Sequence, residues 1–137
     1  MSNWRHDPRV VAGILLAGRL LLAALFLHEG ATKIGSYAGA LAYAKAYGVP
    51  AALLPLAVAV ELGGGLLIAL GIFTRTAALA LAGFCMTTAF VFHTKFAEIN
   101  QLIHFEKNMA IAGGLLVLAA SGPGRWTVTR WRSLKDT

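Results

Sequence analysis

The sequence predicts an all-α integral membrane protein, a four-helix bundle with its N and C termini in the cytoplasm. Three observations predict this class. Of the 137 residues, 58% are hydrophobic and 13% charged, whereas soluble domains carry about 25% charged residues. Four apolar runs follow one another, each roughly 20 residues long, which is the length that crosses the hydrocarbon core of a bilayer. Basic residues are distributed unequally between the two sides that these runs define.

The first predicted helix extends from about residue 10 to residue 31. Asp7 and Pro8 before it are typical of a helix N-cap and a first helical residue. A cleaved signal peptide is the rival interpretation. The run is too long for the apolar part of such a peptide, however, and Arg19 interrupts it. We therefore expect this segment to remain as a transmembrane helix.

Three further transmembrane helices are predicted at residues 51–72, 76–94 and 102–121. Pro55 lies in the first turns of the second helix, where its missing N–H is tolerated. The last helix stops at Gly122-Pro123-Gly124. Between the first two spans, the segment Gly35–Gly48 contains three tyrosines among Ala and Leu, and we predict a short helix lying on the membrane surface.

The distribution of basic residues predicts the topology. Four spans put both termini on one side, together with the loop between the second and third helices. That side carries seven basic residues: Arg5, Arg9, Arg75, Arg125, Arg130, Arg132 and Lys135. The other side carries four: Lys33, Lys45, Lys95 and Lys107. The excess favours cytoplasmic termini. Trp4, Trp126 and Trp131 would lie at the same interface, as an aromatic belt does.

The net charge of +6 and the pI of about 10.0 do not indicate a nucleic-acid-binding protein. No basic stripe is interleaved with exposed aromatic residues, and anionic lipid headgroups explain the basic residues more simply. Cys85 is the only cysteine, so disulfide or dithiol chemistry by this chain alone is excluded.

Arg19 and Glu61 are charged residues in the middle of apolar runs. Counted from the predicted helix ends, each lies roughly 15 Å deep in the bilayer. An unpaired charge there costs about 2.5–3.5 kcal/mol on insertion scales. We therefore predict a buried Arg19–Glu61 ion pair between the first two helices, with either a structural role or a role in proton or ligand binding.

Five polar residues are predicted to lie near the outer ends of the helices and to converge on a pocket that opens outward. Glu29 and Lys33 are four residues apart on one helix face, and Lys33 continues the heptad stripe of Arg19 and Phe26. The other members are His93, His104 and Asn108. A solvated rim of helix ends is the alternative interpretation.

No metal, flavin or nicotinamide site is predicted. His93 and His104 alone are too few for a metal centre, which needs three or four converging ligands. The sequence has no dinucleotide-binding, phosphate-binding, zinc-protease or nucleophile-elbow motif. No catalytic residue can be assigned.

Polar and glycine positions along most of the chain, from about residue 12 to 122, resemble those of the DoxX family of bacterial four-helix membrane proteins. The positions that carry the resemblance are Gly18-Arg19-Leu20, Phe26, Gly30, Lys33, Tyr47-Gly48-Val49-Pro50, Glu61-Leu62-Gly63-Gly64-Gly65-Leu66-Leu67, Leu70-Gly71-Ile72-Phe73-Thr74-Arg75, His93, Lys107-Asn108 and Gly113-Gly114.

The resemblance implies a multi-pass protein of the bacterial cytoplasmic (inner) membrane. Members of the family are linked to quinone-dependent oxidoreductases, oxidative-stress complexes and quinone detoxification. It therefore implies a quinone-linked redox or oxidative-stress component that works with a partner oxidoreductase, with a quinone as its cofactor. The alternative is a non-catalytic membrane anchor, assembly factor or small-molecule carrier subunit. A homo-oligomer is compatible with the sequence, which leaves the oligomeric state open.

Overall fold

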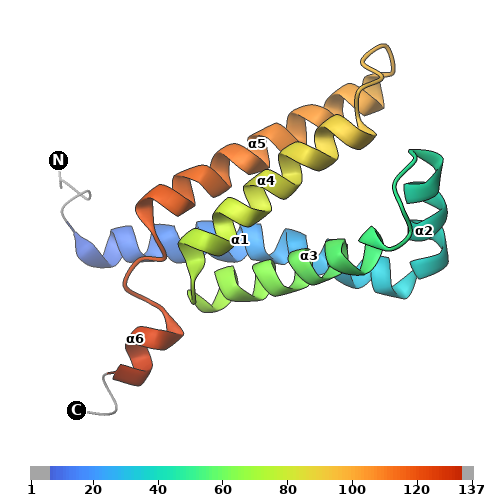
Figure 1. Ribbon diagram of the computed structural model, residues 1–137. Helices are drawn as coiled ribbons and strands as arrows, with labels where there is room; N and C mark the ends of the chain where they lie inside the picture. The colour runs from blue at the N-terminus through green and yellow to red at the C-terminus, as the bar shows by residue number, and fades with distance from the viewer. Residues whose placement is uncertain (1–6, 134–137) are drawn as a thin grey trace.

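The protein is built from α-helices (Figure 1). The structure, a computed structural model, describes residues 7–133, and no strand occurs among them. The helices are α1 (Pro8–Gly35), α2 (Tyr37–Ala46), α3 (Leu53–Leu70), α4 (Thr74–Phe92), α5 (Ile99–Ser121) and α6 (Val128–Ser133). Four of them, α1, α3, α4 and α5, are long and apolar enough to cross a membrane. The predicted fold class and the short helix after the first span are confirmed.

The ends of the helices follow local signals in the sequence. The Asp7 side chain accepts a hydrogen bond of 2.8 Å from the backbone N–H of Arg9, and Pro8 is the first residue of α1. α1 continues to Gly35, beyond the predicted end at residue 31, and α5 begins at Ile99 rather than at residue 102. The predictions for Trp4, Arg5 and Lys135 lie outside the described residues.

The four long helices form two antiparallel pairs. α1 packs along α3 and α4 packs along α5, while α3–α4 contacts and fewer α1–α5 contacts join the pairs. The two pairs cross near the end that carries both termini and diverge toward the other end (Figure 1). We call these the inner end and the outer end. At the outer end α2 projects from the α1–α3 pair, and its Tyr43 ring stacks on Phe92 of α4 at 5.4 Å.

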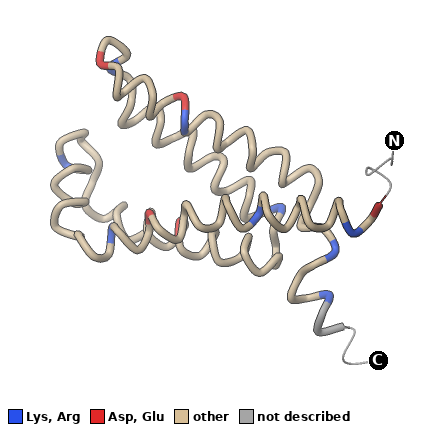
Figure 2. Tube along the Cα trace, turned by 180° about the vertical axis from the view of Figure 1, so that it is seen from behind, with Lys and Arg blue, Asp and Glu red and all other residues tan. Residues whose placement is uncertain are grey.

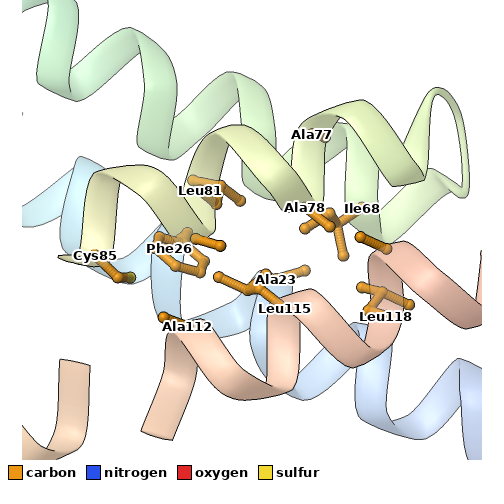
Figure 3. Close-up of a cluster of buried hydrophobic side chains, with 12 residues drawn as sticks. Ala23, Phe26, Ile68, Ala77, Ala78, Leu81, Cys85, Ala112, Leu115 and Leu118 are labelled. Atoms are coloured by element: carbon orange, nitrogen blue, oxygen red, sulfur yellow. The ribbon is translucent and has the colours of Figure 1, made fainter. Parts of the chain in front are cut away.

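The core lies where the two pairs meet (Figure 3). Ile68, Leu81 and Leu115 are its largest fully buried side chains, and alanines fill much of the remaining space. Close approach depends on glycine. A Cβ at Gly64 would lie 2.9 Å from Leu81 Cγ, and one at Gly30 would lie 2.7 Å from Leu62 Cγ. Small residues at such contacts let membrane helices gain van der Waals packing energy, which largely drives their association.

Candidate functional site

A cluster of three charged side chains lies at the outer half of the α1–α3 pair. The Lys33 ammonium donates to Glu61 Oε1 at 2.9 Å and to Glu29 Oε2 at 3.4 Å. Exposure rises along this cluster. The side chain of Glu61 is 5% exposed, that of Lys33 26% and that of Glu29 51%. The cluster therefore links a carboxylate inside the bundle to a carboxylate at its surface.

The close packing of α1 on α3 brings these residues together. Lys33 lies on the same stripe of α1 as the buried Arg19 and Phe26, so its side chain is directed toward α3. A Cβ at Gly30, one turn before Lys33, would lie only 3.4 Å from Glu61 Cβ. The missing side chain at Gly30 thus allows Lys33 to reach the carboxylate of Glu61.

The predicted Arg19–Glu61 ion pair is wrong, although both residues are buried as expected. The Arg19 guanidinium donates to three backbone carbonyls: Pro123 at 2.6 Å, Trp126 at 2.8 Å and Ala69 at 3.4 Å. Ala69 lies eight residues beyond Glu61 along α3, which corresponds to about 12 Å at 1.5 Å per residue. The register between α1 and α3 therefore places Arg19 toward the inner end and Lys33 opposite Glu61.

One oxygen of the Glu61 carboxyl group has no hydrogen-bond partner in the described part of the chain. Oε1 accepts from Lys33, whereas Oε2 is buried and unpartnered. Buried polar atoms are nearly always satisfied, so an exception calls for a physical explanation. A free carboxyl oxygen beside an ammonium group can bind a donor, or can take up and release a proton.

A second cluster lies at the outer end of the α4–α5 pair. The His93 and His104 rings stack with their centroids 5.1 Å apart. His93 Nδ1 is 3.0 Å from Gln101 Oε1, and the Gln101 amide donates to the Tyr47 hydroxyl at 3.3 Å. This chain of contacts connects the end of α4, the first turn of α5 and the residue that caps α2.

Aromatic side chains pack beside the histidines and hold α2 against α4. Tyr43 and Tyr47 both contact Phe92, with ring centroids 5.4 Å and 5.2 Å apart. Burial, followed by the neighbouring Tyr47 hydroxyl, raises the pKa of Tyr43 to about 12. The short helix is therefore fixed by specific ring contacts as well as by its apolar composition.

Four of the five residues predicted for the outward pocket thus fall into two pairs, and Asn108 belongs to neither. The structure joins Glu29 to Lys33, and His93 to His104. No hydrogen bond, ion pair or ring contact links these two groups within residues 7–130. Asn108 is half-buried on α5 and forms no side-chain hydrogen bond with the described residues. The same part of the chain contains no group of three potential metal ligands.

The assignment from sequence alone missed Glu61 as the partner of Lys33, and Gln101 and Tyr47 as partners of His93. The heptad stripe of Arg19, Phe26 and Lys33 was the available signal for the Lys33–Glu61 contact, because it directs the Lys33 side chain into the bundle. No sequence signal indicated that Tyr47 would reach α5, since this contact depends on how α2 folds back.

Most of the chain is similar in sequence to known proteins. The family model described as DoxX matches residues 14–94. This match contains Glu29, Lys33, Glu61 and His93, and it ends before His104 and Asn108. Inner membrane protein YqjF of Escherichia coli K12 is 48% identical over 118 residues, which cover 86% of this chain and 90% of YqjF. Inner membrane protein YphA of the same strain is 33% identical over 124 residues, covering 85% and 89%. No solved structure matches the chain.

Proposed function

The chain belongs to the DoxX family and is a multi-pass protein of the inner membrane, and on this basis we propose that it is a quinone-linked redox component. A partner oxidoreductase supplies the electrons, because the sequence carries no flavin or nicotinamide motif and only one cysteine. The Glu29–Lys33–Glu61 cluster binds the quinone and exchanges protons with it.

The observation that carries this proposal is the buried, unpartnered Oε2 of Glu61 beside the Lys33 ammonium. An ionisable group within a transmembrane segment is costly to bury, and it commonly marks a ligand site or a proton pathway. Here two such groups are paired, and one of them keeps a free oxygen. That oxygen can accept a hydrogen bond from a ligand or take up a proton.

The chemistry of a quinone suits these groups. Reduction to the quinol consumes two electrons and two protons, and both protons are added at the carbonyl oxygens. The Lys33 ammonium is a hydrogen-bond donor for one carbonyl, and Glu61 passes on protons that reach it through Lys33 and the exposed Glu29.

The test is to purify the full chain from native membranes and measure the quinone retained per protein after detergent exchange. We expect quinone to copurify with the wild type and to fall at least tenfold in Lys33→Met and Glu61→Gln. Lys107→Met is the matched control, because it removes an exposed ammonium from α5, outside the cluster, and should retain the quinone.

The proposal fails if the wild type carries no quinone and shows no quinone-dependent oxidation of any donor. It also fails if the control variant loses quinone to the same extent as the cluster variants. A stoichiometric protein partner, retained equally by the wild type, Glu61→Gln and His93→Ala, would instead favour a non-catalytic anchor, assembly factor or carrier subunit.

A further inference from the structure

The inner end of the bundle contains a cavity that the proposed redox function does not use. Its volume is about 810 Å³, and it lies between the start of α1, the end of α3 and the segment that leads into α6. Four arginines line it: Arg9, Arg19, Arg125 and Arg130. The remaining wall is largely apolar and includes Leu70, Trp126 and Val128.

Among the described residues, no ion pair neutralises the positive charge of this cavity. None of the ion pairs within the described residues involves any of the four arginines. Asp7 is the nearby carboxylate, and its side chain caps α1 by accepting from the Arg9 backbone N–H. Figure 2 shows the same asymmetry: blue predominates at the end that carries both termini, and red appears there at the start of α1. This excess of positive charge suits an anionic ligand.

The four arginines differ in what they can offer that anion. Arg19 is 2% exposed, and its two terminal nitrogens are held by backbone carbonyls. Its role toward an anion is therefore that of a fixed charge. Arg9, Arg125 and Arg130 are exposed, and no side-chain hydrogen bond holds their guanidinium groups within the described chain. Their planar donor groups match the oxygens of a phosphate.

The position of the cavity decides between an anion from solution and a lipid. It lies where α1, α3 and α5 reach the end of their membrane-spanning stretch, which is the level of the lipid headgroups. Trp126 is 51% exposed beside it, as is typical of a residue in the interfacial belt. Basic pockets between transmembrane helices at this level bind anionic headgroups. The apolar wall has no role toward a free phosphate ion, but it suits the glycerol and upper acyl chain of a lipid.

We infer that this arginine-lined cavity is a binding site for an anionic phospholipid. The lipid phosphate contacts Arg125, Arg130 and Arg9, and its apolar part lies against Leu70 and Trp126. The bound lipid fixes the segment after α5 to the start of α1. This site is at the opposite end of the bundle from Glu61, so it does not depend on the proposed redox function.

The test uses the full chain in detergent and measures lipid binding by native mass spectrometry, with phosphatidylglycerol and phosphatidylcholine as probes. We expect the wild type to bind phosphatidylglycerol at least tenfold more tightly than phosphatidylcholine. The double variant Arg125→Gln/Arg130→Gln should bind it about thirtyfold more weakly, since each basic residue near an anionic surface contributes about fivefold. Its binding of phosphatidylcholine should not change.

The matched control is Lys95→Gln/Lys107→Gln, which removes the same number of charges from the outer end and should keep wild-type binding. Equal affinity for the two lipids would overturn the inference, and so would an equal loss in the control. Millimolar inorganic phosphate that displaces phosphatidylglycerol completely would also overturn it, because the site would then be one for a free anion. Both double variants replace exposed residues, and a thermal unfolding midpoint near that of the wild type verifies that they fold.

Discussion

At the inner end of the bundle the buried Arg19 donates only to backbone carbonyls, whereas at the outer half the buried Glu61 is paired with the side chain of Lys33. The helix ends explain the difference. The last carbonyls of a helix have no partner within it, so α3 and the residues after α5 supply acceptors for a guanidinium. Arg75 is held in the same way, by the carbonyls of Ala119 and Ala120 at 2.7 Å and 2.6 Å.

A carboxylate in the middle of α3 has no free backbone donor nearby, because the N–H groups around it form hydrogen bonds within the helix. It must take its donor from a side chain on another helix. Lys33 satisfies Oε1 and leaves Oε2 free. Within the described chain, both buried charges keep one unpartnered atom, Arg19 Nε and Glu61 Oε2, but only the carboxylate oxygen can take up a proton. The inner end therefore uses its buried charge for structure, whereas the outer cluster leaves a proton-accepting atom available.

The largest effect should come from Arg19→Met. This change leaves three carbonyls without their donor, and hydrogen bonds to a charged group each contribute about 1.5–3 kcal/mol. We expect a loss of at least about 4 kcal/mol in the free energy of unfolding, measured in lipid bicelles. Lys107→Met, which removes an exposed cation from α5 outside both sites, is the control and should lose less than about 1 kcal/mol. Equal losses in the two variants would show that Arg19 is not the structural centre of the inner end.

A smaller loss is expected for Lys33→Met, which removes the only cation paired with Glu61 among the described residues. Breaking a buried ion pair typically costs about 3–5 kcal/mol, and proton uptake by Glu61 lowers that cost. We expect about 3 kcal/mol in the same unfolding assay. Adding Glu61→Gln should restore part of the stability, because the stranded carboxylate is gone. A double variant less stable than Lys33→Met would contradict this account.

The next effect tests how closely the inner end is packed. Gly71 caps α3 with a φ of 74°, and a Cβ there would lie 2.6 Å from Thr127 Cγ2 and 2.8 Å from Arg19 Nη1. Gly71→Ala should therefore destabilise the protein by about 1–3 kcal/mol. Gly63→Ala is the matched control on the same helix. It meets nothing within 4 Å and should be neutral or stabilising by up to about 1 kcal/mol.

The smallest effect concerns the docking of α2. Because the pKa of Tyr43 is raised to about 12, the folded protein holds the hydroxyl proton more tightly than the unfolded chain, whose tyrosines titrate near pH 10. This contribution to stability is complete below pH 10 and is lost as the pH rises through 12. Tyr47→Phe should lower the pKa of Tyr43, as measured by absorbance titration against Tyr43→Phe. An unchanged pKa of Tyr43 would contradict the role given to Tyr47.

The sequence was sufficient to predict the fold class, because lipid restricts the alternatives so strongly. Apolar runs of spanning length must be helices, and Asp7-Pro8 fixes the start of the first one. The prediction that the first and second spans are neighbours was also correct. The short α6 was not foreseen, since Val128–Ser133 has neither the length nor the periodicity that identifies a helix in a sequence.

The candidate site was less accessible to sequence reasoning, because pairing depends on the register between helices. Depths counted from helix ends placed Arg19 and Glu61 at the same level. α1 in fact continues past the predicted boundary to Gly35. The close approach of α3 to α1 at Gly30 brings Glu61 next to a part of α1 about three turns beyond Arg19. The stripe of Arg19, Phe26 and Lys33 correctly predicted that the Lys33 side chain is directed into the bundle. The depth estimate, however, predicted the wrong partner for Glu61.

Two double-mutant cycles in lipid bicelles test whether Lys33, and not Arg19, is the partner of Glu61. One cycle combines Lys33→Met with Glu61→Gln, and the other combines Arg19→Met with Glu61→Gln. The structure predicts a coupling energy above about 1 kcal/mol for the first cycle and within about 0.5 kcal/mol of zero for the second. Strong coupling between Arg19 and Glu61, with none between Lys33 and Glu61, would contradict it.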